Sequence, residues 1–157
     1  MAKRSAGILL YRGEASGIEV LLVHPGGPFW AKKDAGVWSI AKGEYAEGEE
    51  EPLACAVREF TEELGAVPSG PFLDLGELTQ PSRKVVRAWA ARGEFDPADI
   101  KSGTFKMEWP PKSGWMQTFP EVDRAAWFTP DAARRKILPG QLPFIDRLLL
   151  ALTDGAG

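Results

Sequence analysis

The strongest constraint on the fold is a short acidic segment, residues 58–65, with the sequence Arg-Glu-Phe-Thr-Glu-Glu-Leu-Gly. It ends a predicted amphipathic helix whose apolar side chains recur at spacings of four, three and four: Leu53, Val57, Phe60 and Leu64. Pro52 suits a first helical turn, and Gly65 stands where a left-handed C-cap is expected. The pattern predicts a helix from about Glu51 to Leu64, with its apolar stripe in the core.

Three carboxylates share one patch of this predicted helix, because Glu59, Glu62 and Glu63 occupy positions i, i+3 and i+4. Side chains at these spacings are neighbours, so their negative charges repel unless something neutralises them. A hard divalent cation, Mg²⁺ or Mn²⁺, is the expected neutraliser because such ions prefer oxygen ligands. Arg58 can reach Glu62, either as a surface ion pair contributing under ~1 kcal/mol or as a clamp that keeps a carboxylate charged.

The segment before the helix predicts a place for phosphates. Residues 38–44 form a short extended run that we expect to break at Gly43 into a loop, residues 43–48. A strand, a glycine-opened loop and a helix N-terminus together offer free N–H groups to anions. Lys42 adds a positive charge beside that loop.

Residues 43–66 resemble the signature of the Nudix hydrolases, in which a glycine and a glutamate precede Arg-Glu-aliphatic-x-Glu-Glu-x-Gly. Six positions match in register: Arg58, Glu59, Phe60, Glu62, Glu63 and Gly65. Six residues separate Gly43 from Glu50, where the pattern has five, so the loop carries one extra residue. Glu49 is the alternative match for the signature glutamate, and the final aliphatic position is Ala66.

The resemblance implies an α/β/α sandwich and a metal-dependent enzyme that cleaves a nucleoside diphosphate linked to another group. Carried over by position, Glu59, Glu62 and Glu63 would be the main metal ligands, assisted by the backbone carbonyl of Lys42. Arg58 would orient one of the glutamates. Mg²⁺ or Mn²⁺ would neutralise phosphate charge and activate the attacking water.

The family often uses one more carboxylate, as ligand or general base, from a loop outside the signature. Glu121, just ahead of a tryptophan-bearing late strand, is the first candidate, followed by Glu108 and Asp123. For each of them a solvated loop charge is the alternative. His24 is the only histidine, which excludes a Ser-His-Asp triad together with any two-histidine metal site, and Cys55 is expected to be a buried small side chain.

Candidate substrate contacts come from aromatic and basic residues in loops. Trp30 and Trp109 lie in proline-rich segments, where they could stack on a nucleobase, although core packing is the usual role of the six tryptophans. Five basic residues are candidate phosphate contacts: Lys32, Lys33, Arg83, Lys84 and Lys112. Of these we place Lys84 with Trp30, Lys42, Gly43 and Trp109 in the substrate site.

The order of features resembles the diadenosine polyphosphate hydrolase branch, although Ala41 replaces its usual proline. The leading substrate is therefore diadenosine tetraphosphate, cleaved to AMP and ATP. Hydrolysis of (oxidised) nucleoside triphosphates, or removal of pyrophosphate from RNA 5′ ends, is one alternative. A nucleotide-sensing module without turnover is another, but such modules typically lose signature glutamates, and this chain keeps Glu59, Glu62 and Glu63.

Length and composition favour one cytoplasmic domain over residues 1–157. The net charge of −3 predicts no broad nucleic-acid binding, and the longest apolar runs are far below the ~20 residues of a membrane span. One cysteine excludes an internal disulfide framework. The oligomeric state is not readable from the sequence.

Strand patterns complete the prediction of a mixed sheet with helices on both faces. The expected strands are residues 5–12, 18–24, 37–40, 72–79, 84–91, 104–108 and 125–128. A long loop is expected at 109–119. Two further helices are expected, one starting at Thr129-Pro130 and one over residues 144–152.

Overall fold

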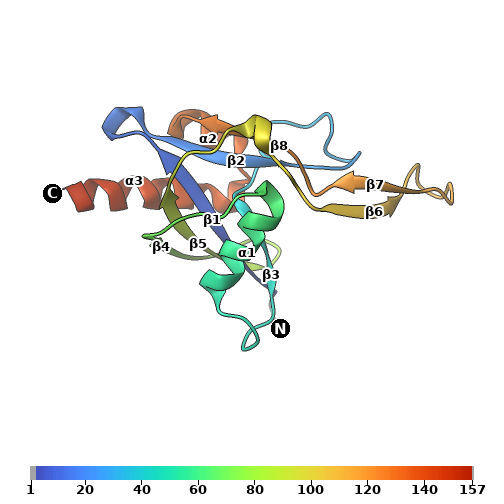
Figure 1. The fold of residues 1–157 in the computed structure, drawn as a ribbon, viewed down its shortest axis with the longest axis horizontal. Coiled ribbons are helices and arrows are strands. Elements are labelled where there is room, and N and C mark those ends of the chain that lie inside the picture. Colours follow the sequence, from blue (N-terminus) through green and yellow to red (C-terminus); the bar gives the residue numbers. More distant parts are fainter. Residues whose placement is uncertain (1–2, 157) are drawn as a thin grey trace.

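The structure is a computed structural model that describes residues 3–156. A six-stranded mixed sheet forms its centre (Figure 1), and its middle strand is β1, Arg4–Arg12. One edge of β1 pairs in parallel with β5, Val85–Arg92. Its other edge is shared between two antiparallel strands: β3, Ala41–Tyr45, pairs with residues 4–8, and β2, Glu19–Pro25, pairs with residues 11–12. This divided edge opens the sheet between β2 and β3.

The outer strands are antiparallel to their neighbours. β4, Leu73–Thr79, lies beside β5, and β8, Val122–Phe128, lies beside β2. Short 3-10 turns at Ala15–Gly17, Pro97–Asp99 and Pro139–Gln141 connect elements. The strand expected at 37–40 is reduced to single bridges at Trp38 and Ser39, because each pairs with a different partner, Ile137 and Val23.

Helices cover both faces of the sheet, which confirms the predicted α/β/α sandwich (Figure 1). α1, Pro52–Leu64, lies on one face; α2, Pro130–Lys136, and α3, Leu142–Ala156, lie on the other. The strand residues alternate between two cores because successive side chains of a strand point to opposite faces. The α1 core contains Ile8, Leu10, Cys55, Phe60 and Leu64, and the opposite core contains Leu9, Leu22, Phe144, Ile145 and Leu148.

Both ends of α1 follow from its sequence. Pro52 occupies the first turn, and Gly65 ends the helix in the left-handed region at φ 80°, with its N–H donating to the Thr61 carbonyl.

Cys55 is buried, and burial raises the pKa of its thiol to about 11, as expected for a packed side chain without nucleophilic character.

The boundary expected at Gly43 is wrong. Gly43 lies inside β3, where it pairs with Ala6, and the loop begins only after Tyr45. Residues 46–49 then form a turn closed by a 3.0 Å hydrogen bond from the Glu49 N–H to the Ala46 carbonyl. Gly48 supplies the left-handed residue of this turn at φ 87°, so the extra residue of the loop is accommodated there.

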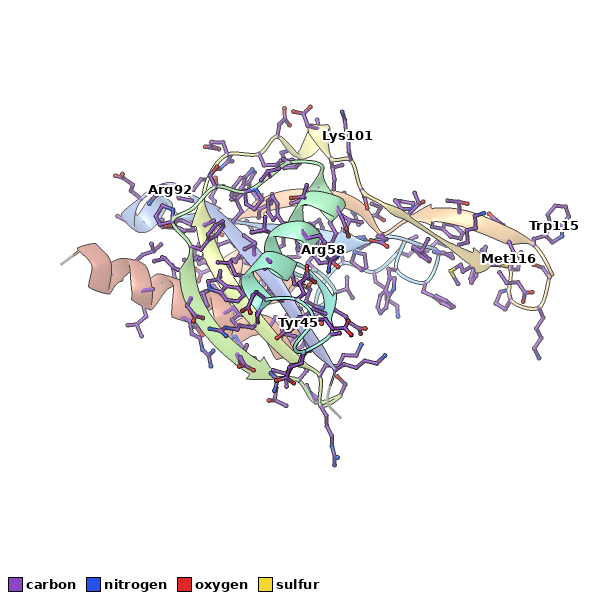
Figure 2. The ribbon with its side chains drawn as sticks, turned by 60° about the horizontal axis from the view of Figure 1, so that its bottom comes forward. Tyr45, Arg58, Arg92, Lys101, Trp115 and Met116 are labelled. Atoms are coloured by element: carbon purple, nitrogen blue, oxygen red, sulfur yellow. The ribbon has the colours of Figure 1, made fainter. Side chains whose placement is uncertain are left out.

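The expected loop over residues 109–119 is also wrong in its second half. Residues 116–120 form β7, Met116–Pro120, which pairs antiparallel with β6, Thr104–Glu108. The two strands make a hairpin that extends away from the sandwich (Figure 2), and we call it the arm. The carboxylate of Glu108 closes its tip by accepting hydrogen bonds from the backbone N–H groups of Lys112 and Gly114.

Candidate active site

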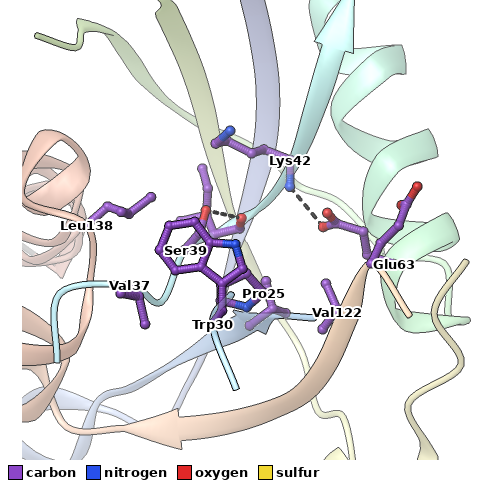
Figure 3. Close-up of a pocket in the computed structure, with 11 residues that line it drawn as sticks. Pro25, Trp30, Val37, Ser39, Lys42, Glu63, Val122 and Leu138 are labelled. Atoms are coloured by element: carbon purple, nitrogen blue, oxygen red, sulfur yellow. Dashed lines mark hydrogen bonds between the residues drawn. The ribbon is translucent and has the colours of Figure 1, made fainter. Parts of the chain in front are cut away.

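Glu59 and Glu63 lie on the side of α1 that meets β3, one helical turn apart. Both are partly buried, whereas Glu62 is exposed, so the three glutamates do not share one environment. The carboxylate of Glu63 accepts a 3.1 Å hydrogen bond from the backbone N–H of Lys42 in β3 (Figure 3). This contact fixes the signature helix against the strand that precedes the signature loop.

Burial makes Glu63 costly to ionise in the metal-free protein. Desolvation raises its pKa to about 8, and the negative charges of Glu59 and Glu121 act in the same direction. Desolvation by burial also raises the pKa of Glu59. The positive charge of Arg58 opposes this increase, and the negative charges of Glu62 and Glu121 add to it. Glu59, Glu63 and Glu121 are therefore close enough to repel one another.

Arg58 is a clamp rather than a simple surface ion pair. Its Nε and Nη2 atoms donate to the two carboxylate oxygens of Glu50 at 3.0 and 2.9 Å. Its Nη1 atom donates to Glu59 at 2.9 Å and, at 3.3 Å, to the predicted partner Glu62. Glu50, and not Glu49, thus fills the signature position that holds the arginine. These contacts keep the pKa of Glu50 below its usual value, with the hydrogen bond to Arg58 as the main cause.

Gly43 is required by the position of Glu59. A Cβ atom built on Gly43 would lie 2.0 to 2.3 Å from the carboxylate atoms of Glu59, well inside contact distance. The missing side chain therefore allows the carboxylate to lie directly against β3. This gives the signature glycine a physical role, although it is a strand residue and not the start of a loop.

We expect Gly43→Ala to lower turnover by roughly 10- to 100-fold, because displacing Glu59 by about 1 Å misplaces a group that must be held in a fixed geometry. Gly17→Ala is a suitable control, since no atom lies within 4 Å of its added Cβ. Steady-state rates and melting temperatures of both variants check the prediction. Full activity of Gly43→Ala would show that the position of Glu59 against β3 is not needed.

The three carboxylate candidates outside the signature lie in different places. Glu121 precedes β8, is exposed, and lines the same cavity as Glu63. Asp123 accepts a 2.8 Å hydrogen bond from His24, and Glu108 is at the tip of the arm. Only Glu121 of these three is both near the signature glutamates and exposed to a substrate.

A cavity of about 250 Å³ adjoins the carboxylates. Trp30 forms one wall, and Lys42, Glu63 and Glu121 provide its charged lining, while most of the rest is apolar: Val23, Pro25, Val37, Ile40, Val122 and Leu138 (Figure 3). An apolar slot with a few convergent polar groups is the usual form of a small-molecule site. Lys42 is partly buried there, and desolvation lowers its pKa, against the opposing effect of Glu63.

Three predicted substrate residues lie outside the lining of this cavity: Gly43, which is part of β3, Lys84 and Trp109. Lys84 is near Glu44, with 3.8 Å between ammonium and carboxylate, and its charge acts on Lys42. Trp109 belongs to the arm and contacts Phe29 edge to face, with 5.4 Å between ring centroids. Lys84 and Trp109 therefore lie beside the site without lining it. Lys84 is close enough to Lys42 for their charges to interact, and Trp109 contacts Phe29, the residue next to Trp30.

Sequence reasoning missed the buried polar groups behind the cavity. His24 is fully buried, with Nδ1 at 2.8 Å from Asp123 and Nε2 at 2.7 Å from the Lys33 carbonyl, so it is a scaffold residue. Gln141, also fully buried, accepts from the Ile40 N–H at 3.1 Å and donates to the Ser39 hydroxyl. No motif marks Gln141, because its partners are about a hundred residues away in the sequence.

The carboxylates fit a hard divalent cation in their chemistry. Glu59, Glu63 and Glu121 offer oxygen donors, and a cation would offset both the burial that mainly raises the pKa values of Glu59 and Glu63 and the repulsion that adds to it. Among the side chains that the structure describes, no three acidic, histidine or cysteine groups are already arranged as a ligand set. Each hydrogen bond, from Arg58 to Glu59 and from the Lys42 amide to Glu63, uses one carboxylate oxygen, so the other oxygen of each glutamate is left to bind an ion.

Comparisons with known proteins identify the family and the fold of this chain. The sequence matches the NUDIX domain family over residues 1–148. An Ap4A hydrolase from C. elegans, solved as a binary complex, has a TM-score of 0.65 at 20% identity, covering 96% of this chain and 98% of that one. The NUDIX domain of Shewanella oneidensis NrtR, solved with ADP ribose, has a TM-score of 0.64 at 17% identity, covering 97% and 89%.

A third similar fold is the C-terminal domain of mouse MUTYH, solved in complex with human PCNA, with a TM-score of 0.60, 16% identity, and coverage of 96% and 89%. No curated protein sequence matches this chain. At these identities the solved structures show a common fold.

The family match and the shared fold define the class of this protein, a hydrolase that acts on phosphoanhydrides. The chain belongs to the Nudix family, as the family match over residues 1–148 shows. Among the described residues, no helix is long and apolar enough to cross a membrane.

Proposed function

We propose that this chain, as a single domain over residues 1–157, is a Mg²⁺- or Mn²⁺-dependent pyrophosphohydrolase. Its substrate would be a nucleoside diphosphate linked to another group. The observation that supports this most strongly is the set of partly buried glutamates, Glu59 and Glu63, beside a cavity large enough for part of a nucleotide. Two carboxylates held where they repel each other have little structural use.

In this proposal Glu59, Glu62 and Glu63 hold the cation, with the backbone carbonyl of Lys42 as a further ligand. When bound, the cation supplies charge neutralisation for the phosphates and lowers the pKa of a water molecule. Arg58 holds Glu50, Glu59 and Glu62 in place through its guanidinium. Hydrolysis breaks one P–O bond of the anhydride and forms a P–O bond to water, whose proton passes to a base.

Glu121 is the proposed base, because its carboxylate lines the cavity and is not in an ion pair among the described residues. We expect Glu121→Gln to lower turnover by about 10²- to 10⁴-fold, the usual contribution of general base catalysis, with little change in metal affinity. Glu108→Gln is the matched control, since Glu108 is at the arm tip. Rate measurements over a Mg²⁺ titration check this, and an unchanged rate for Glu121→Gln would eliminate the role.

For the substrate ends, we propose that Trp30 stacks on a nucleobase, with Trp109 supporting it, and that Lys42, Gly43 and Lys84 face the phosphates. Diadenosine tetraphosphate, cleaved to AMP and ATP, is the leading substrate. The Ap4A hydrolase fold similarity and the ADP ribose complex of a second similar protein support a dinucleotide or nucleotide-sugar ligand.

The alternative enzyme activity is hydrolysis of (oxidised) nucleoside triphosphates or removal of pyrophosphate from RNA 5′ ends. The alternative class is a nucleotide sensor without turnover. A panel of nucleotides tested with and without Mg²⁺ separates them. We expect metal-dependent release of a nucleoside monophosphate. The compound that is cleaved best would identify the branch of the Nudix family. Tight nucleotide binding without any product would favour the sensor and contradict the proposal.

A further inference from the structure

Trp30, which forms one wall of the cavity, lies in a loop outside the strands of the sheet. Trp30 lies in the segment that joins β2 to β3; we call residues 26–33 the aromatic loop. Its side chain is 39% exposed, and the neighbouring Phe29 is 58% exposed, so neither is held by burial in a core. A cavity wall needs a fixed position if it is to discriminate between ligands. Contacts from other segments must therefore hold this loop against the cavity.

One end of the aromatic loop is anchored from inside the sandwich. The Nε2 atom of His24 lies 2.7 Å from the Lys33 carbonyl, and its Nδ1 atom lies 2.8 Å from Asp123 of β8. The Lys33 N–H in turn donates to the Trp30 carbonyl at 2.9 Å, and the Lys33 ammonium lies 5.2 Å from the centre of the Trp30 ring. This anchor fixes the end of the loop nearer to β3.

The other end is held by the arm, about eighty residues later in the sequence. The ring of Phe105 in β6 lies directly over Gly27, where an added Cβ would be 2.9 Å from its Cζ atom. Gly26 lies against the Pro120 carbonyl of β7, which would be 1.9 Å from an added Cβ. Trp109 contacts Phe29 edge to face at 5.4 Å. Three successive contacts thus press one face of the arm onto the loop.

The sequence of the arm explains why one of its faces packs on the aromatic loop. In β6 and β7, alternate residues point to the same side. Phe105 pairs with Phe119, and their ring centroids are 6.0 Å apart, while Trp109 continues the same face toward the tip. The opposite face carries Lys106, Glu108 and Thr118, which are exposed. The apolar face is therefore the one that covers the loop.

Gly103 and Glu121 lie at the end of the arm next to the sandwich, which we call its root. They connect the arm and the aromatic loop to α1. The Gly103 N–H donates to the Glu62 carbonyl at 3.0 Å, and the Glu121 N–H donates to the Gly103 carbonyl at 2.9 Å. The Glu121 carbonyl accepts from the Gly26 N–H at 2.9 Å. Helix α1, the root of the arm, the proposed base and the aromatic loop are thus joined by consecutive backbone hydrogen bonds.

We propose that Phe105 and Trp109 are positioning residues that hold the aromatic loop so that Trp30 forms the nucleobase wall of the cavity. This inference rests on the proposed function for the identity of the ligand. The arm thereby determines selectivity for the base end of a nucleotide, while the phosphate end is left to the carboxylates and lysines. Phe105 and Trp109 do not line the cavity, so their effect on a ligand passes through Trp30.

The test compares Trp30→Ala, Phe105→Ala and Trp109→Ala with Trp115→Ala. Trp115 is a matched control because it is an arm tryptophan that is 72% exposed at the tip (Figure 2). Two ligands are titrated by calorimetry with Mg²⁺ present: AMP, which carries a base, and inorganic pyrophosphate, which does not. The indole N–H signals of the six tryptophans are recorded by NMR, with that of Trp30 identified from Trp30→Phe.

We expect Trp30→Ala to weaken AMP binding by roughly 5- to 100-fold, the usual effect of removing one stacking partner. Phe105→Ala and Trp109→Ala should weaken AMP binding by about 3- to 10-fold, shift the Trp30 indole signal and leave pyrophosphate affinity unchanged. Phe105→Leu should restore most of the AMP affinity, because a large apolar side chain again covers Gly27. Trp115→Ala should behave as the wild type.

Unchanged Trp30 signals and AMP affinities in Phe105→Ala and Trp109→Ala would overturn the proposal. An equal loss of pyrophosphate affinity would also overturn it, since this would show general damage to the site. A wild type that hydrolyses nucleotides while the arm variants keep its KM and kcat would leave the proposed function standing and refute the role of the arm. A wild type that neither binds AMP nor hydrolyses nucleotides would refute both.

Discussion

Glu63→Gln is expected to lower metal-dependent turnover by about 10³-fold or more and, at the same time, to raise the melting temperature of the metal-free protein. The loss of rate follows from removing a charged group that stabilises the reacting phosphate through the cation. Glutamine keeps the size of the side chain and can still accept the hydrogen bond from the Lys42 N–H. The fold should therefore survive the change.

The gain in stability follows from the pKa of Glu63. Burial raises this pKa to about 8 in the folded protein, above the value of an unfolded glutamate near 4.5. Between these two values the folded state binds more protons than the unfolded state, so the stability of the metal-free protein falls as pH rises. Glutamine carries no charge at any pH and removes this loss.

Thermal melting with and without Mg²⁺ between about pH 5 and pH 8 measures both effects. The wild type should lose stability across this window relative to Glu63→Gln, and Mg²⁺ should restore more of it to the wild type than to the variant. Glu49→Gln is the control, because it makes the same chemical change at an exposed glutamate in the loop before α1. Loss of fold in Glu63→Gln would show that Glu63 is structural.

The helix and its charged residues were predictable from the sequence because they depend on local order. The spacing of Phe60 and Leu64 sets the buried face, Gly65 sets the end, and both are as expected. The spacing alone did not separate Glu62 from its neighbours. Its exposure, against the burial of Glu59 and Glu63, depends on where β3 lies against the helix.

The parts that were not predictable depend on contacts between distant segments. Nothing near Glu50 distinguishes it from Glu49, and the choice is made by the geometry of Arg58 eight residues later. The sequence predicts a loop at Gly43 because glycine is typical of loops, whereas in the structure this glycine leaves room for Glu59. Residues 116–120 lack a strong strand pattern of their own, and their pairing with β6 defines them as a strand.

The second large effect is expected for Phe60→Ala, which should leave the chemistry intact and destabilise the fold. Phe60 is 2% exposed in the core between α1 and the sheet, so its truncation should lower the free energy of unfolding by ~3–5 kcal/mol. For a chain of this size, that loss lowers the melting temperature by about 6–20 °C.

The control for Phe60→Ala is Val67→Ala, because Val67 is a 72% exposed apolar residue just after the helix and should change stability by less than about 0.5 kcal/mol. Below its melting transition, Phe60→Ala should keep most of its activity per folded molecule, since the hydrogen bonds that hold Glu59 and Glu63 come from Arg58 and the Lys42 N–H. Chemical denaturation and turnover measured on the same samples separate the two quantities. A normal stability with a large loss of rate would mean that Phe60 acts on the glutamates directly, and the division between a packing face and a reactive face of α1 would then be wrong.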